Sequence, residues 1–262
     1  MKVEKVTNHI VKWLKNYATN AKVNGFVIGI SGGIDSAVTS SLCAMTGFKV
    51  LCLEMPIHQG ENQVDRAKEH IKQLKSKFDH IESLEINLTN TFEEFKKSVP
   101  KKKQNDTVDL SLANTRARLR MSTLYYFAGL NGLLVAGTGN KVEDFGVGFF
   151  TKYGDGGVDL SPIADLMKSE VYEIAKYLNV SKSIQKAQPT DGLFGDTRTD
   201  EDQIGASYDE LEWAMKMKDL KKSLDDFKGR QKEVYSIFTQ RNNANKHKMI
   251  PIPVCEIPKE YL

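Results

Sequence analysis

A strand, a pair of glycines and a helix follow one another near the start of this chain, and this order of elements limits the possible folds more than any other feature. Residues 25–30 are apolar and partly β-branched, which predicts a short buried strand. Ser31-Gly32-Gly33-Ile34-Asp35-Ser36 follows, and residues 37–45 then carry apolar side chains at helical spacing until Gly47. Such a unit is typical of a sheet that is covered by helices.

The turn between this strand and this helix is suited to bind an anion. Gly32 and Gly33 let the backbone come close to an oxygen, and the start of the helix offers unpaired N–H groups. Ser31 and Ser36 add hydroxyl donors, whereas Asp35 repels a phosphate unless a cation lies between them. We therefore predict a phosphate site with a cation. The alternative is a tight turn in which Asp35 only caps the helix.

Two common nucleotide-binding loops are excluded by the spacing. No Gly-Lys-Ser/Thr follows the glycines, as a Walker loop requires, and the G-x-G-x-x-G pattern of dinucleotide-binding folds is absent. The hexapeptide resembles instead the Ser-Gly-Gly-x-Asp-Ser/Thr signature of the ATP pyrophosphatases. Members of that family cleave ATP to AMP and pyrophosphate and activate a substrate as its adenylate. The resemblance implies that Ser31, Gly32, Gly33, Asp35 and Ser36 bind ATP.

Strands and helices alternate along the rest of the chain. Further strands are predicted at 50–55, around 84–86 and at 133–136, and helices at 3–17, 64–74, 110–130, 171–178 and from Asp200 to Asn245. This alternation predicts an α/β fold, a doubly wound parallel sheet with helices on both faces, plus a helical C-terminal extension. No linker rich in Pro or Ser divides the chain, so we expect a single domain over 1–262 whose helical part begins at about 200.

The composition argues against several classes of protein. The 262 residues contain no apolar run of the roughly 18 residues that a membrane helix needs. Cys43, Cys52 and Cys255 form neither a metal-binding pattern nor a disulfide framework, so we expect a reducing cytoplasm. The net charge of +3 is modest, and Lys101-Lys102-Lys103 is expected to be a solvated loop, with no nucleic acid as partner.

A second block of motifs narrows the family. It runs from Gly137-Thr138-Gly139-Asn140-Lys141-Val142-Glu143 through Thr151-Lys152-Tyr153-Gly154-Asp155-Gly156-Gly157-Val158-Asp159 to Lys168, and it resumes at Pro189-Thr190-Asp191-Gly192-Leu193 and at 199–205. Together with the arginine-bearing segment 114–121, these motifs closely resemble the NAD synthetases, over most of the chain. The chain departs from the family at Val142, where Ser is common, and at Met249, where Arg usually follows His-Lys.

The resemblance implies a ligase reaction in two steps. ATP adenylates the nicotinate carboxyl of deamido-NAD (nicotinic acid adenine dinucleotide) and releases pyrophosphate, and ammonia then displaces AMP to give NAD. Adenylation is needed because a carboxylate oxygen is a poor leaving group. The charge of the triphosphate must be neutralised, and Mg²⁺ does this with a few carboxylates and the phosphates themselves. The resemblance makes Asp35 and Glu143 the expected metal ligands; taken alone, Glu143 is better explained as a solvent-facing helix residue.

The same resemblance implies further ATP ligands. These are Arg118, with Arg120 as a weaker candidate, and Thr138, Lys168 and Thr190. Lys168 is expected to reach the terminal phosphates as a point charge. Without the resemblance, Thr138 is a turn hydroxyl, Lys168 a surface lysine at a helix start, and Arg118 an ion-paired residue on a helix face.

A third group is expected to bind deamido-NAD. It comprises Lys152, Asp155, Asp159, His247 and Lys248. Asp155 and Asp159 could orient substrate hydroxyls or draw a proton from ammonium, which makes them catalytic candidates beside Asp35 and Lys168. The alternative for their glycine-rich segment is a plain surface turn.

The nitrogen source and the assembly follow from the same family. Glutamine-dependent members carry a separate amidase domain with a catalytic cysteine, and only about 25 residues precede the first strand here. We therefore expect ammonia as the nitrogen donor, and a homodimer by resemblance. Two other functions stay open at this point: another adenylate-forming ATP pyrophosphatase such as a GMP synthetase, and a nucleotide-binding regulator without turnover.

Overall fold

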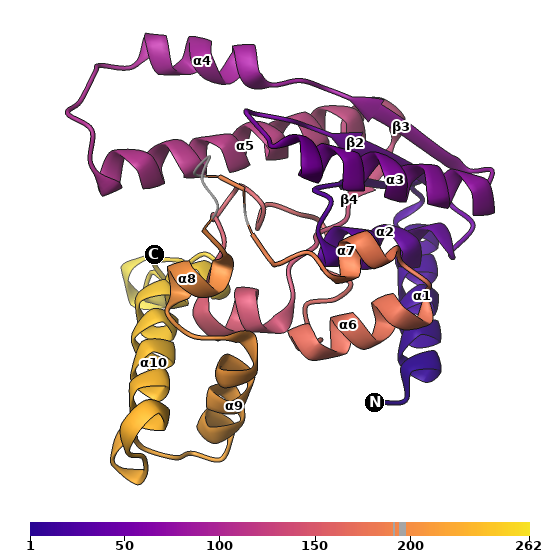
Figure 1. The fold of residues 1–262 in the computed structure, drawn as a ribbon. Coiled ribbons are helices and arrows are strands. Elements are labelled where there is room, and N and C mark those ends of the chain that lie inside the picture. Colours follow the sequence, from indigo (N-terminus) through magenta and orange to yellow (C-terminus); the bar gives the residue numbers. More distant parts are fainter. Residues whose placement is uncertain (191, 194–197) are drawn as a thin grey trace.

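Four parallel strands form the centre of the part of the protein that the structure describes (Figure 1). The structure is a computed structural model, and it describes residues 1–190, 192–193 and 198–262. The strands are β1 (Gly25–Gly29), β2 (Lys49–Glu54), β3 (Ile81–Glu85) and β4 (Leu133–Val135), in the spatial order β3-β2-β1-β4. Val27 in the middle of β1 pairs with Leu51 and with Val135. The chain order therefore reverses at β1, where a doubly wound sheet places its ligand site.

Helices connect and cover these strands. The helices of the main body are α1 (Val3–Ala21), α2 (Ile34–Ala44), α3 (Glu61–Lys77), α4 (Thr89–Ser98), α5 (Asp106–Asn131), α6 (Lys168–Tyr177) and α7 (Lys182–Gln185). A π-helical segment η1 (Val142–Val147) follows β4. The C-terminal part contains α8 (Asp200–Ile204), α9 (Tyr208–Asp219), η2 (Leu224–Asp226), α10 (Gly229–Met249) and η3 (Lys259–Tyr261).

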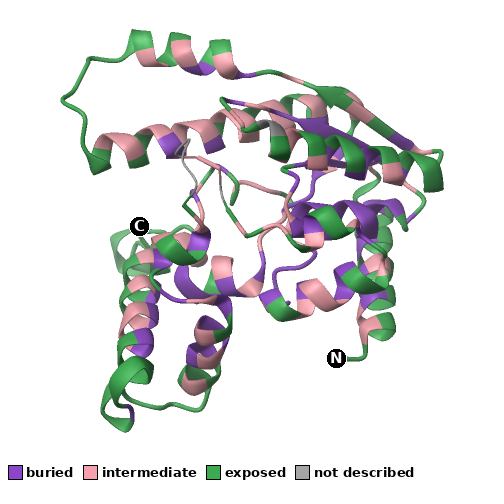
Figure 2. Ribbon diagram, in the orientation of Figure 1, coloured by how far each residue is buried: buried purple, intermediate pink, exposed green. Residues whose placement is uncertain are grey.

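The two faces of the sheet bury alternate residues of each strand. Phe26, Ile28, Val50 and Cys52 point to a core that they share with α1, α2, α3 and α6. Val27, Leu51, Leu53 and Val135 point to the opposite core, which α4 and α5 complete. Figure 2 shows the buried residues concentrated in the sheet and on the helix faces turned toward it. Because both faces are covered, the strands are apolar on both sides, as the sequence indicated.

The C-terminal helices form a second group beside the sheet. In Figure 1, α9 and α10 lie side by side, away from α1 and the strands. Their core includes Leu211, Val234 and Phe238 together with Val142 and Val147 from η1. Val142 is therefore a packing residue that ties η1 to this group.

The doubly wound α/β fold with C-terminal helices confirms the predicted fold class. The third strand was predicted around 84–86, and Leu84 and Glu85 do lie in β3, which begins earlier, at Ile81; α4 was not predicted. The segment from Asp200 to Asn245 is helical in pieces and is not continuous. Gly205, with a φ of 90°, ends α8 in a left-handed conformation, and the hydroxyl of Ser207 then caps α9 by accepting from the backbone N–H of Glu210.

Among the described residues, no helix is both long and apolar enough to cross a lipid bilayer.

Candidate active site

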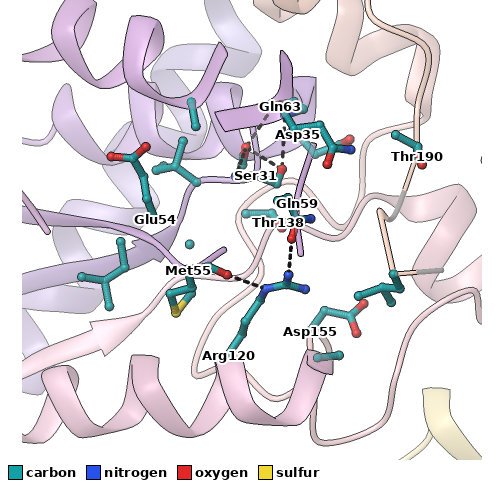
Figure 3. A pocket seen from close by; sticks show the side chains of 18 of the residues that line it. Ser31, Asp35, Glu54, Met55, Gln59, Gln63, Arg120, Thr138, Asp155 and Thr190 are labelled. Carbon is teal, nitrogen blue, oxygen red and sulfur yellow. Dashed lines mark hydrogen bonds between the residues drawn. The ribbon is translucent and has the colours of Figure 1, made fainter. Parts of the chain in front are cut away.

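The carboxyl ends of β1, β2 and β4 open onto one cavity of about 290 Å³ (Figure 3). The cavity is lined by the β1–α2 turn, the β2–α3 loop, α5, the segment after β4, the start of α6 and residues near position 190. Its lining includes most of the predicted ATP and metal ligands: Ser31, Gly33, Asp35, Ser36, Thr138, Glu143, Lys168 and Thr190, and also Asp155. Residues far apart in the sequence thus converge at one edge of the sheet.

The β1–α2 turn has the geometry of an anion-binding loop. Gly32 has a φ of +79°, and a Cβ there would lie 2.4 Å from the carbonyl oxygen of Gln63, so only glycine fits. Gly33 is the N-cap of α2 and supplies no side-chain cap, which leaves N–H groups at the helix start for a ligand. Ser31 Oγ and Ser36 Oγ lie 3.1 Å apart beside them.

Asp35 is not the cap of this helix. Its Oδ1 accepts a hydrogen bond of 3.0 Å from the Asn140 side-chain N–H, and its Oδ2 accepts one of 2.6 Å from Lys168 Nζ. The carboxylate therefore points across the sheet edge toward the segment after β4. This geometry contradicts the capping alternative and favours a role for Asp35 in the cavity.

Lys168 joins the two predicted metal ligands. Its Nζ lies 2.6 Å from Asp35 Oδ2 and 2.9 Å from Glu143 Oε1, and its side chain is only 3% exposed. The hydroxyl of Tyr208 on α9 donates to the same Glu143 oxygen at 2.6 Å. Glu143 is thus a cavity residue and not the solvent-facing helix residue of the alternative interpretation.

The pKa values of this group reflect burial and mutual charge. Burial raises the pKa of Asp35, against the opposing charge of Lys168. Burial also acts to raise the pKa of Glu143, but Lys168 and Tyr208 outweigh it and hold that pKa below its ordinary value. Burial alone would lower the pKa of Lys168, and the two carboxylates raise it instead. Lys168 is therefore held firmly in its charged form.

The donors present fit a magnesium ion that substrate phosphates help to bind. Asp35 and Glu143 offer hard carboxylate oxygens, and the ammonium group of Lys168 already bridges them. No group of three or more His, Cys, Asp or Glu side chains suited to a metal occurs within the described ranges. Mg²⁺ commonly takes one or two carboxylates and completes its shell with phosphate oxygens and water. The chain thus has the donors for a metal that arrives with a nucleotide.

Arg120, the weaker arginine candidate, lines the cavity, and Arg118 does not. Arg120 donates from Nε to the carbonyl of Met55 at 3.0 Å and from a terminal nitrogen to Gln59 Oε1 at 2.7 Å, as Figure 3 shows. Arg118 is exposed, and its guanidinium donates to the carbonyl of Lys152.

Several polar residues from the β2–α3 loop and α3 line the cavity without having been predicted. They are Gln59, Gln63 and Arg66, with Glu54 at the end of β2. Arg66 Nε donates to the carbonyl of Gly32 at 3.1 Å and so supports the phosphate loop. Their signal in the sequence was their position, because they follow a strand whose carboxyl end meets the same sheet edge as Ser31.

Two of the five predicted dinucleotide ligands line a second, adjoining cavity of about 180 Å³. Asp155 lines both cavities, and Lys248 lines the second. Lys248 Nζ donates to the carbonyls of Gly148 and Phe150, and Lys152 Nζ donates to the carbonyl of His247. Together these contacts connect the glycine-rich segment to the end of α10.

Asp155 is exposed and is the carboxylate that lines both cavities. Its Oδ1 accepts a hydrogen bond of 2.9 Å from the backbone N–H of Thr151. Loss of hydration around the carboxyl raises the pKa of Asp155 to about 6. A carboxyl with such a pKa changes its charge close to neutrality, which suits a group that handles protons.

Asp159 is not brought to either cavity. Its Oδ1 accepts from the hydroxyl of Tyr125 at 3.0 Å and its Oδ2 from the backbone N–H of Val135 at 2.8 Å. These bonds fix the end of the glycine-rich segment to β4, a positioning role that the sequence did not indicate.

Thr190 lies at the side of the first cavity opposite Glu54 (Figure 3). Its hydroxyl donates to the carbonyl of Arg198 at 3.2 Å. Asp191, next to Thr190 in the predicted motif, lies outside the described residues.

Comparison with known proteins identifies a family. Residues 6–251 match the family described as NAD synthase. The chain is 34% identical over 252 residues to the NH3-dependent NAD+ synthetase of Carboxydothermus hydrogenoformans, covering 96% of this chain and 98% of that one. It is 37% identical over 263 residues to the enzyme of the same name from Methanosarcina acetivorans, covering 98% and 100%.

Two solved structures of similar sequence have the same fold as this chain. The NMN synthetase of Francisella tularensis superposes with a TM-score of 0.84 at 32% identity, covering 99% of both chains. The NH3-dependent NAD synthetase of Campylobacter jejuni superposes with a TM-score of 0.78 at 28% identity, covering 98% of this chain and 100% of that one.

Proposed function

This chain belongs to the NAD synthase family, and we propose that it makes NAD from deamido-NAD, ATP and ammonia through the site described above. The nicotinate carboxylate attacks the α-phosphorus of ATP, and the bond from that phosphorus to pyrophosphate breaks. Ammonia then attacks the carbonyl carbon of the adenylate, AMP leaves with the bonding electrons, and the nitrogen loses a proton. The near full-length family match disfavours a GMP synthetase or a regulator without turnover.

The phosphate loop and its neighbours act in the first step. N–H groups at the start of α2 and the hydroxyls of Ser31 and Ser36 hold phosphate oxygens, and Thr138 and Thr190 line the same cavity. Lys168 stabilises the charge that develops on the departing pyrophosphate. A bound Mg²⁺ would neutralise the triphosphate, and Asp35 and Glu143 would hold it.

The glycine-rich segment acts in the second step. Asp155 lies where the two cavities meet, so its carboxylate can orient ammonium and accept its proton. Lys248, which lines the second cavity, and Lys152 and His247, which are joined to each other by a hydrogen bond, are the proposed contacts of the dinucleotide. Asp159 is proposed to act through the segment that it fixes to β4.

The observation that carries this proposal is the meeting of Asp35, Glu143 and Lys168 beside the phosphate loop. The test is to incubate the pure protein with ATP, magnesium, ammonium and deamido-NAD and to measure NAD with an alcohol dehydrogenase. NAD, AMP and pyrophosphate should form in equal amounts. Formation of ADP instead of AMP would contradict the mechanism.

A second substrate is favoured by one comparison. The structure with the TM-score of 0.84 is an NMN synthetase, so the same chemistry could act on nicotinic acid mononucleotide. The reacting carboxyl is identical in both substrates, and only the second nucleotide differs. Measuring kcat/KM for each of them under the same conditions decides which one this chain prefers.

The assembly is proposed to be a homodimer. On α1, Ile10, Leu14 and Ala18 are buried within the chain, and Trp13 and Tyr17 are 39% and 42% exposed. On α5, by contrast, Tyr126 and Leu130 are 65% and 66% exposed, which supports an apolar contact with a second copy. Light scattering after size exclusion tests this. The cytoplasm remains the proposed location, consistent with three free cysteines.

A further inference from the structure

We propose that the ammonium group of Lys168 occupies the magnesium position in the free protein and gives it up only when metal and triphosphate arrive together. This inference rests on the proposed metal ligands Asp35 and Glu143. It adds that the metal position is closed by a residue of the chain until the nucleotide binds.

The geometry of the lysine matches that of a bridging cation. Nζ lies 2.6 Å from the carboxylate of Asp35 on α2 and 2.9 Å from that of Glu143 on η1. A magnesium ion held by the same two oxygens would lie about 2.1 Å from each. Since both cations need the space between the same oxygens, they exclude each other there.

The carboxylates do not depend on the lysine for their position. Asn140 holds Asp35 through Oδ1, and its own side-chain oxygen accepts from the backbone N–H groups of Val142 and Glu143. Tyr208 separately donates to Glu143. Lys168 can therefore leave while both carboxylates stay in place to receive a metal.

Lys168 cannot serve the phosphates fully where it lies. Two of its three N–H groups are used on the carboxylates, and the ring of Tyr208 lies 4.7 Å from Nζ. A metal that takes over the carboxylates frees these donors for the triphosphate in the same cavity. Lys168 also begins α6, and the positive end of a helix dipole disfavours a cation but favours an anion such as phosphate.

The test measures metal binding without nucleotide. Mn²⁺ serves as the probe, and its free concentration is followed by electron paramagnetic resonance with wild type, Lys168→Met and Lys168→Gln. The neutral variants should bind one Mn²⁺ at least about tenfold more tightly than wild type, because the competing cation is gone. Mn²⁺ should also raise the Tm of the variants and leave that of wild type nearly unchanged.

Two controls make the result specific. Lys141→Met removes a lysine that pairs with the exposed Asp165 at 2.9 Å, and it should behave as wild type. The double variant Asp35→Asn with Lys168→Met should lose the gained Mn²⁺ site. Circular dichroism shows whether each variant is folded, and the Gln variant keeps hydrogen bonding if the Met variant does not fold.

The outcomes separate this inference from the proposed function. The proposed exchange of the Lys168 ammonium for the metal is overturned if wild type binds Mn²⁺ as tightly as the neutral variants, or if the double variant keeps the Mn²⁺ site. This holds even when wild type makes NAD. If the neutral variants gain the site and wild type makes no NAD, the exchange stands and the proposed function fails.

Discussion

Asp35 is the residue whose contacts bear most directly on catalysis. Asp35→Asn keeps the size of the side chain and removes the charge that would hold magnesium. We expect the rate of NAD formation to fall at least about a hundredfold, the scale of losing one electrostatic element of a site. Asp165→Asn, a change at a 97% exposed carboxylate, is the matched control. Near-normal turnover of Asp35→Asn at saturating magnesium would show that Asp35 is not a ligand.

Arg120 and Arg118 form a second matched pair. Arg120→Lys breaks the contacts to Met55 and Gln59, so we expect kcat/KM for ATP to fall by about tenfold, the value of one charged hydrogen bond. Arg118→Lys should leave the ATP dependence unchanged, since Arg118 lies outside the cavity. Steady-state kinetics with ATP varied tests both, and the reverse result would restore Arg118 as the ATP ligand.

Asp155 predicts an acid limb in the pH profile. Its pKa is raised to about 6, so below that pH its carboxylate becomes neutral and activity should fall about tenfold per pH unit. The assay must hold free NH3, not total ammonium, constant, so that the limb reports the enzyme. Asp155→Asn should be slow at every pH and lack the limb.

The same raised pKa has a consequence for folding. The folded chain binds this proton more tightly than the unfolded chain, so stability is lost as pH rises through about 6. Asp155→Asn should therefore be at least as stable as wild type at neutral pH. In the activity measurements, an acid limb that persists unchanged in Asp155→Asn would assign the titration near pH 6 to another group.

The sequence ranked Arg120, which lines the cavity, below Arg118 for an identifiable reason. Arg118 and Arg120 stand two positions apart on one helix, and only the orientation of the helix decides which one faces the sheet. Ala113, Ala117 and Ala128 are the buried residues of α5, and Arg120 follows Ala113 by seven residues, close to two full turns. The spacing of the buried alanines thus indicates that Arg120 faces the sheet, whereas the resemblance to the family motif favoured Arg118.

At the scale of elements, α2 and α3 meet through a buried polar pair. Ser40 Oγ lies 2.8 Å from His70 Nε2, and Ser40 also donates to the carbonyl of Ser36. Because Ser40 already donates its hydroxyl proton to the carbonyl of Ser36, Nε2 of His70 must be protonated and donate to Ser40. Within the described residues Nδ1 has no partner, so protonating it would bury an unsatisfied donor. Burial accordingly lowers the pKa of His70 to about 4.

This pair predicts a loss of stability in acid. The unfolded chain takes up the proton from about pH 6.5 downward, while the folded chain resists until about 4, so stability is complete above 6.5 and falls below it. The loss between about pH 6.5 and 5 should be about 2 kcal/mol. Urea unfolding of wild type and His70→Gln measures it. The variant should lack most of this loss, and His9→Gln, at an exposed position, should keep it.

Elements with strong periodicity were predictable, and weak ones were not. The strand before Ser31 and the helix after it follow from apolar runs bounded by glycine. In α4 only Phe92 is buried, so its sequence carried little helical signal. The C-terminal breaks depend on Gly205 and Ser207, which are ordinary stop and start signals that a continuous helical pattern obscured.

At the scale of the molecule, the site requires two groups of elements. The sheet supplies the phosphate loop, and α9 supplies Tyr208, which donates to Glu143. The sequence indicated the sheet edge, because parallel strands end together there. It did not indicate Tyr208, since no local pattern specifies how the C-terminal helices pack against η1.

The nitrogen source is a property of the whole chain. Releasing ammonia from glutamine calls for a nucleophile, for which a cysteine thiolate is well suited. Cys43 and Cys52 are buried, and burial raises the pKa of Cys43 well above its ordinary value and that of Cys52 to about 12, so both remain inert thiols. Cys255 is exposed on the segment after α10.

We therefore expect ammonium to support NAD formation and glutamine, with this chain alone, to support none above its trace of free ammonium. The measurement is NAD formed with each donor, together with glutamate released from glutamine. Cys255→Ser should keep the full ammonium-dependent rate. Glutamine use at a rate comparable with that of ammonium would contradict the expectation, and its loss in Cys255→Ser would identify the thiol responsible.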